Sequence, residues 1–217
     1  MRQTPERWAV YTGVVAVVLW IVGVFVIESG NVPGEKTTEA EFLAYYQEDA
    51  NRILIGSWLF MIGCLAFIWF AIVLRDRLAA AEGGSRMFSN LAFVGAVATG
   101  AFAMLSAGPD VAAAIQEEDL SSAAAASMAT MGDAFFVAAE LSAILLMIGA
   151  GAVALRSGIF PKAWAWFSFF LAVILVIGPI GWAALVFGLP IWVLGTTFFL
   201  ARRSETAAAE PVTALRT

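Results

Sequence analysis

The sequence predicts an all-α protein, a polytopic bundle of six transmembrane helices with both termini in the cytoplasm. The residues are 61% apolar and only 13% charged. The charges fall in short stretches between long apolar runs, whereas helices of water-soluble proteins carry charges along their whole length. Lipid offers the backbone no hydrogen-bond partner, and these runs are too long for barrel strands and lack their alternation, so helices are the expected spanning form.

The first apolar run, residues 8–27, contains no charged residue and is long enough to cross roughly 30 Å of hydrocarbon. Arg2 and Arg7 precede it, as basic residues precede the apolar core of a secretion signal. The run is too long for a secretion signal, however, and Glu28-Ser29-Gly30 is a poor cleavage site. We therefore expect an uncleaved first span.

Three further runs predict spans at residues 53–74, 87–107 and 134–155. The last apolar segment, 163–201, is too long for one helix and contains Gly178-Pro179 near its middle. We divide it into spans at 163–180 and 183–200, with a re-entrant or strongly kinked element as the alternative. Pro190 is expected to bend the final helix. Residues 1–203 then form one transmembrane domain, and 204–217 form a flexible cytoplasmic tail.

The distribution of basic residues favours six crossings over five. Of the 12 Lys and Arg residues, six crossings leave only Lys36 and Arg52 on the outer side. Five crossings would place Arg202 and Arg203 outside, against the positive-inside tendency. With six, the basic residues on the inner side are Arg2, Arg7, Arg75, Arg77, Arg86, Arg156, Lys162, Arg202, Arg203 and Arg216.

The two long outer loops are acidic and contain helix-start signals. Thr38-Glu39-Ala40-Glu41 has the form of a capping box, and the aromatic residues after it are expected to rest on the membrane interface. In the second loop, Pro109-Asp110 is expected to start a helical turn. The alanine-rich run 121–127 is expected to continue as helix through Asp133 into the fourth span.

Glu140 is the main candidate for a functional residue because it is the one ionisable residue well inside a predicted span. It lies seven positions after Asp133 on the same helix face, roughly 10 Å into the hydrocarbon. A carboxylate at that depth needs a partner, water or a proton. The alternatives are a functional acid, a neutral acid bonded to a neighbouring helix, or an ion pair with Arg52. Glu140, Asp133 and Arg52 form the candidate polar site.

Several kinds of chemistry have no support in the sequence. The chain has no histidine, which removes imidazole-based zinc sites, ordinary haem ligation and Ser-His-Asp catalysis. Cys64 is the single cysteine, so no intramolecular disulfide forms. Gly83-Gly84-Ser85 lacks the context of a phosphate loop, and the inner loops are too sparsely basic for nucleic acid. We predict no catalytic, cofactor-binding or metal-binding residues.

Residues 153–164, VALRSGIFPKAW, resemble the inner turn of a family of bacterial six-helix membrane proteins catalogued only as a domain of unknown function. In that family an apolar span ends in arginine and a Pro-basic-aromatic turn opens the next span. Asn51-Arg52, followed by Gly56 and Leu59, is similar to the start of the family's second span. The resemblance implies the six-span layout and no activity.

The sequence names no activity, and two function classes remain. The first is a non-enzymatic membrane partner, a sensor or assembly protein whose acidic outer loops bind another protein. The alternative is a small transporter or permeation protein with Glu140 in a polar cavity. An enzyme is the least supported class. The expected location is the bacterial cytoplasmic membrane, where the lipid bilayer surrounds the spans.

Overall fold

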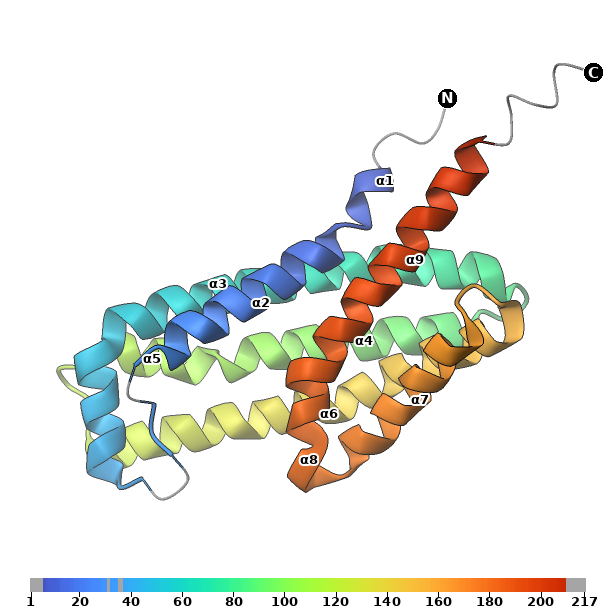
Figure 1. Cartoon of the computed structure of the whole chain (residues 1–217). Helices are drawn as coiled ribbons and strands as arrows, with labels where there is room; N and C mark the ends of the chain where they lie inside the picture. The colour runs from blue at the N-terminus through green and yellow to red at the C-terminus, as the bar shows by residue number, and fades with distance from the viewer. Residues whose placement is uncertain (1–5, 31, 35–36, 210–217) are drawn as a thin grey trace, which may run out of the picture.

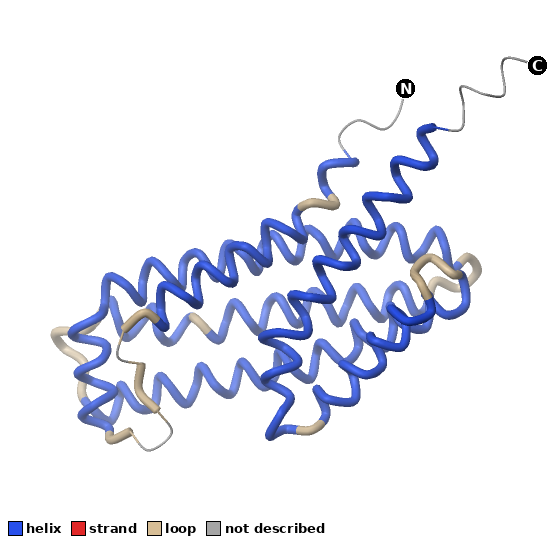
Figure 2. The backbone as a smooth tube through the Cα atoms, viewed as in Figure 1, coloured by secondary structure: helices blue, strands red, loops and turns tan. Residues whose placement is uncertain are grey.

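The computed structural model describes residues 6–30, 32–34 and 37–209, and every regular element in these ranges is helical (Figures 1 and 2). This confirms the all-α prediction. Four helical stretches are long and apolar enough to cross a membrane, which identifies a membrane protein. They are Glu39–Glu82, Met87–Ile115, Ser122–Ser157 and Ile180–Arg203, and two shorter apolar helices accompany them, Thr12–Glu28 and Lys162–Val176.

The helices follow one another with short connections. In chain order they are α1 (Glu6–Ala9), α2 (Thr12–Glu28), α3 (Glu39–Glu82), α4 (Met87–Ser106), α5 (Gly108–Ile115), α6 (Ser122–Ser157), α7 (Lys162–Val176), α8 (Gly178–Ala183), the π-helical turn η1 (Ala184–Gly188) and α9 (Leu189–Ala209). Most of them run along one axis, with α9 crossing the bundle at a slant (Figure 1).

Helices α3 and α6 are much longer than a bilayer is thick. With 44 and 36 residues, they measure about 66 Å and about 54 Å at roughly 1.5 Å per residue. Figure 1 shows the first turns of α3 bent away from the rest of the helix, so that they lie across one end of the bundle. Parts of both helices must therefore lie outside the hydrocarbon.

Exposed side chains mark where the apolar surface begins. On α3, large apolar side chains are exposed from Ile55 onward, and on α6 from Met131 onward; the earlier turns of both helices expose charged and small residues instead. Such a belt of exposed apolar side chains is the surface that a membrane protein presents to lipid. On α3 the belt consists of Ile55, Trp58, Ile62, Leu65, Trp69 and Ile72.

Small residues let α4 and α6 approach closely. A Cβ added at Gly149 of α6 would lie 2.6 Å from the Ala92 nitrogen and 2.6 Å from the Phe88 oxygen, both backbone atoms of α4. Gly95 of α4 is equally tight against Leu146 of α6. Membrane helices use such contacts where water supplies no driving force for association.

Helix α9 closes the bundle by packing between α2 and α7. The Thr197 side chain lies against Gly13 of α2, where no space remains for a Cβ. On the other side, the buried Trp192 indole N–H donates to Ser168 Oγ at 2.8 Å. The core of the bundle thus includes the last helix.

The last apolar segment divides into two helical stretches, as predicted: α7, and a second stretch that runs from α8 through η1 into α9. The division falls at a different residue. α7 ends at Val176 and Ile177 makes the turn, so the predicted span 163–180 is too long and the predicted start of the next span at Ala183 is too late. Pro179 explains the position, because in the first turn of a helix its missing N–H costs no hydrogen bond.

Pro190 follows the π-helical turn η1, in which the Leu189 N–H donates to the Ala184 oxygen. In a regular α-helix the proline ring would clash with the carbonyl four residues earlier, and the wider turn relieves that contact. The helix then continues through Ala209, past residue 204, where the sequence predicts the start of a flexible tail. The rest of that tail, 210–217, lies outside the described residues, as do Arg2, Lys36 and Arg216.

The end of the bundle opposite the bent start of α3 is rich in arginine. There the Glu82 carboxylate accepts the backbone N–H groups of Phe88 and Ser89, at 3.0 and 2.8 Å, and so caps the start of α4. The Arg203 guanidinium donates to the Gly158 oxygen at 2.6 Å and ties α9 to the end of α6. We call this the basic end.

We predict that Gly149→Ala destabilises the protein, although alanine is the better helix former by about 1 kcal/mol. The new methyl group meets backbone atoms that no rotamer change can move, so α4 and α6 must separate. The expected loss is about 1–3 kcal/mol of unfolding free energy. Denaturation in a mixed-detergent titration measures it.

The control is Gly34→Ala, where nothing lies within 4 Å of the added Cβ. Its unfolding free energy should change by less than about 0.5 kcal/mol. Equal stability of the two variants would contradict the close α4–α6 contact.

Candidate functional site

The acidic end of the bundle has a hydrophobic core of its own. The start of α3, all of α5 and the start of α6 meet there, away from the larger core of the bundle (Figure 1). We call residues 37–54 and 108–133 the acidic cap. Its buried apolar residues are Tyr45, Tyr46, Ala50, Ile53, Ala113, Ala114, Leu120 and Ala125.

Local sequence signals start each helix of the acidic cap. The Thr38 side chain accepts the Glu41 N–H, and the Glu41 carboxylate accepts the Thr38 N–H, which confirms the predicted capping box. Pro109 lies in the first turn of α5, also as predicted. Ser121 caps α6, which runs unbroken through Asp133 into the apolar belt, confirming the predicted continuous helix.

The aromatic residues after the capping box pack inside the cap. Tyr46 is 1% exposed, and its hydroxyl donates to Asp110 Oδ1 at 2.7 Å, joining α3 to α5. Nearby, the Gln47 amide donates to the Glu117 oxygen at 3.1 Å and fixes the turn after α5. The aromatic face of this segment therefore covers α5. Its location at the membrane interface stays a prediction.

The cap raises the pKa values of both Asp110 and Tyr46. Burial raises the pKa of Asp110 above its ordinary value, and the nearby Asp133 adds to this, while the hydrogen bond from Tyr46 opposes it. Burial and the charge of Asp110 raise the pKa of Tyr46 as well. Ionisation of Asp110 therefore lowers the stability of the cap.

Arg52 pairs with its own helix neighbour. Arg52 Nη2 lies 2.5 Å from Asp49 Oδ2, and the guanidinium packs against Gly30, where a Cβ would collide with it. In the described structure Arg52 makes no ion pair with Glu140 or Asp133, the pairing that the sequence left open as one alternative. The reason is proximity, because an aspartate three residues earlier on a helix lies within easy reach.

Glu140 points into the bundle, as predicted, and is only 5% exposed. Its carboxylate lies beside Gly181 of α8, where a Cβ would be 3.1 Å from Glu140 Oε2. The acid is thus level with the turn between α7 and α8. No hydrogen bond or ion pair joins it to a described residue, and Asp133, earlier on the same helix, is exposed.

Three hydroxyl groups that a neutral Glu140 could bond are engaged elsewhere. Ser142, Ser106 and Thr99 each donate to a backbone carbonyl of their own helix. The predicted polar site is therefore three separate features: a buried acid, an exposed acid and a paired arginine.

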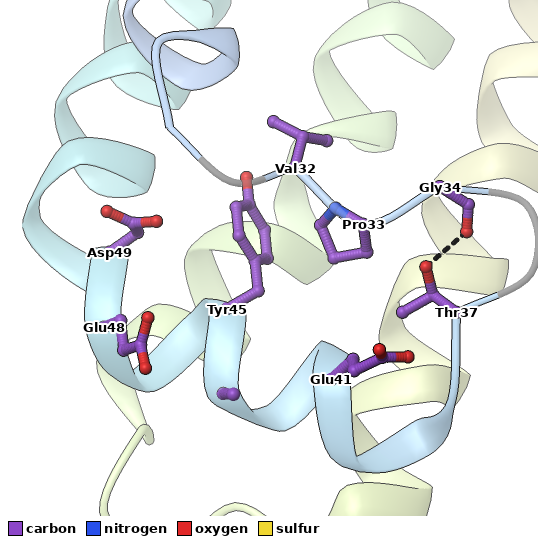
Figure 3. Close-up of a pocket in the computed structure, with 9 residues that line it drawn as sticks. Val32, Pro33, Gly34, Thr37, Glu41, Tyr45, Glu48 and Asp49 are labelled. Atoms are coloured by element: carbon purple, nitrogen blue, oxygen red, sulfur yellow. Dashed lines mark hydrogen bonds between the residues drawn. The ribbon is translucent and has the colours of Figure 1, made fainter.

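Two pockets lie at the acidic end, and Glu140 lines neither. One, of about 330 Å³, lies between the loop before α3 and the first turns of α3 (Figure 3). The other, of about 520 Å³, is a shallow groove between the starts of α3 and α6. The groove is lined by Glu39, Ala123, Ala126, Ser127, Thr130, Met131 and Ala134.

Sequence reasoning did not identify Tyr45, Tyr46, Glu48 or Asp110 as site residues. The spacing of Glu41 and Glu48, seven residues apart, places both on one helix face and is a signal that was available. Within the described chain, no group of three or more His, Cys, Asp and Glu side chains is arranged to hold a metal ion.

Comparison with family models, with curated proteins and with solved structures finds no match to this chain. The resemblance to the six-helix family therefore stays a prediction from its short motifs.

We predict that Asp110→Asn raises stability at neutral pH. The amide oxygen can still accept the Tyr46 hydrogen bond, but the residue no longer has a charged form to bury. Because the pKa of Asp110 is raised in the fold, protonation of this residue stabilises the folded protein. That stabilisation is fully present below the ordinary pKa of 3.8 and is lost as pH rises through the raised pKa. Melting temperatures in detergent from pH 4 to pH 8 measure the difference.

The wild type should approach the variant at the acidic end of this range and fall below it as pH rises. Asp119→Asn, an exposed acid in the turn before α6, is the control and should shift little at any pH. A wild type that gains stability relative to Asp110→Asn with rising pH would contradict the raised pKa of Asp110.

Proposed function

We propose that the protein is a six-span protein of the bacterial cytoplasmic membrane that binds a protein partner through the acidic cap. Both termini are then cytoplasmic, and the cap faces outward. The positive-inside tendency supports this orientation, because the described basic residues other than Arg52 gather at the basic end. α1 and the end of α9 lie toward that same end (Figure 1).

The observation that carries the proposal is that the cap is preformed. Its helices are capped and joined by the Tyr46–Asp110 hydrogen bond, and they enclose their own apolar core. A rigid surface outside the membrane loses little entropy on binding, which is the property of a recognition surface.

Charge indicates the chemistry of the partner. Arg52 is the one basic residue described in the cap, and Asp49 already pairs with it. A negatively charged surface attracts a basic partner and repels another copy of itself. The described acidic residues of the cap are Glu39, Glu41, Glu48, Asp49, Asp110, Glu117, Glu118, Asp119 and Asp133.

The groove between α3 and α6 is the proposed contact surface. Its floor consists of mostly small side chains of α6, with Met131 among them, and Glu39 of α3 forms one edge. Small residues allow another helix or strand to approach the backbone closely, and Glu39 can pair with a basic residue of that segment. The sensor and assembly roles share this surface and differ in the event that binding triggers.

Transport remains the second candidate function, favoured by one observation. Glu140 is a buried acid without a described partner, next to the turn between α7 and α8. An acid inside a membrane protein is a functional candidate by default. Against it, neither pocket at the acidic end reaches Glu140, and the partner role is therefore preferred.

We expect a photo-crosslinking amino acid at Ser127, in the groove, to capture a protein adduct of discrete mass in living cells. The photo-crosslinking amino acid placed at Leu141, in the apolar belt, or at Ser85, in the loop at the basic end, should not capture that adduct. In isolated membranes, raising salt from about 0.1 to 0.5 M should reduce the yield several-fold because the screening length shortens.

Glu39→Gln should also reduce the adduct, whereas Glu28→Gln, an exposed acid outside the cap, should not. Identical adducts from Ser127 and Ser85 would refute a cap-specific partner. Glu140→Gln separates the two functions. If the partner role is right, this variant should still form the adduct. A cation flux in proteoliposomes that the wild type shows and Glu140→Gln abolishes would favour transport instead.

A further inference from the structure

The pocket at the start of α3 is separate from the groove and has a different chemistry. It encloses about 330 Å³, within the range of small-molecule sites. Residues 32–34 and 37, before α3, form one wall and the first three turns of α3 form the other (Figure 3). Its lining residues are Val32, Pro33, Gly34, Thr37, Glu41, Ala44, Tyr45, Glu48 and Asp49.

One wall of the pocket is acidic, and none of the described residues that line the pocket is basic. Glu41, Glu48 and Asp49 all lie on α3. Hydrogen bonds from the backbone and side chain of Thr38 lower the pKa of Glu41, which keeps this carboxylate charged. Asp49 holds Arg52 through Oδ2, whereas Glu48 is exposed and has no described partner.

The side chain of Tyr45 is a second feature of the pocket that indicates a ligand. The side chain is 9% exposed, yet its hydroxyl makes no hydrogen bond to a described residue, in contrast to the adjacent Tyr46. Figure 3 shows the ring standing between Asp49 and Pro33, inside the pocket. Burial, with the charge of Asp110 second, raises the pKa of Tyr45 to about 12, so the hydroxyl stays neutral.

A buried aromatic ring whose hydroxyl bonds no described residue, next to carboxylates, matches an organic cation. The ring face attracts an ammonium group, the phenol oxygen accepts an N–H, and the carboxylates balance the charge. A bare divalent metal is a poorer match, because no described cluster of three acidic, Cys or His ligands converges here.

We propose that this pocket binds an alkylammonium group, with Glu48 and the Tyr45 hydroxyl as its hydrogen-bond acceptors. The alkyl chain lies against Pro33, Val32 and the Tyr45 ring. The group comes either from a free diamine or from a lysine side chain of a peptide, because both present the same charged end on a short alkyl chain. The proposal does not depend on the protein partner at the groove.

The test is calorimetric titration of the full-length protein in a zwitterionic detergent with 1,5-diaminopentane. We expect saturable binding with one site. Glu48→Gln should weaken it by about tenfold, the order expected from losing one charge-assisted hydrogen bond. Tyr45→Phe should weaken it by a smaller factor, because it removes the hydroxyl and keeps the ring.

Glu118→Gln is the matched control, since it removes the same charge from the cap outside the pocket, and its affinity should equal that of the wild type. Melting curves of all variants show whether they remain folded; Glu48 and Glu118 are exposed, so both should. Equal weakening by Glu48→Gln and Glu118→Gln would mean diffuse attraction to a negative surface and would overturn the site. No saturable heat at millimolar diamine would overturn it as well.

Two further ligands identify the source of the ammonium group. Lysine blocked at both backbone ends is compared with blocked norleucine, which has a similar alkyl chain and no charge. Binding of blocked lysine at least as tight as that of the diamine assigns the site to a peptide side chain, and binding of the diamine alone assigns it to a free amine. Binding of norleucine as tight as lysine would contradict ammonium recognition.

Discussion

The length of α3 and α6 relative to the apolar belt is the constraint that gives rise to the acidic cap. Both helices continue for several turns beyond Ile55 and Met131, where large exposed apolar side chains begin. Beyond the belt these turns bury their apolar groups on one another and on α5. The cap is thus a continuation of membrane helices, so a contact at the cap acts directly on helices that cross the bundle.

The cap combines firm internal packing with unfavourable electrostatics. Tyr46 and the capped helix starts hold it together, while Asp110 is half-buried and the cap carries further acids. Repulsion among like charges and the burial of a carboxylate both reduce stability at neutral pH. Local features that cost stability are typical of functional surfaces. The same negative charge favours a basic partner at the groove and an ammonium group at the pocket, which links fold, energetics and proposed function.

Signals within a few residues of each other are readable from the sequence, and contacts across the chain are not. The capping box at Thr38, the start of α5 at Pro109 and the inward orientation of Glu140 all follow from local pattern and the cost of a charge in lipid. The Tyr46–Asp110 bond joins residues 64 positions apart, and no periodicity reveals it. The pairing predicted for Arg52 is with a distant acid, although Asp49 lies one helical turn away. The predicted turn near Pro179 falls too late because apolar residues continue on both sides of it.

Spin-label accessibility along α6 tests most directly whether this helix leaves the membrane to form the cap. Labels at Ala123, Ser127 and Thr130 lie before the apolar belt, and labels at Val137, Leu141 and Leu145 lie within it; all six positions are exposed. In lipid bilayers the first group should be relaxed mainly by a water-soluble nickel reagent and the second mainly by oxygen, with the change near Met131. Oxygen-dominated relaxation at Ala123 and Ser127 would show that the helix start lies in lipid and would contradict an acidic cap outside the membrane.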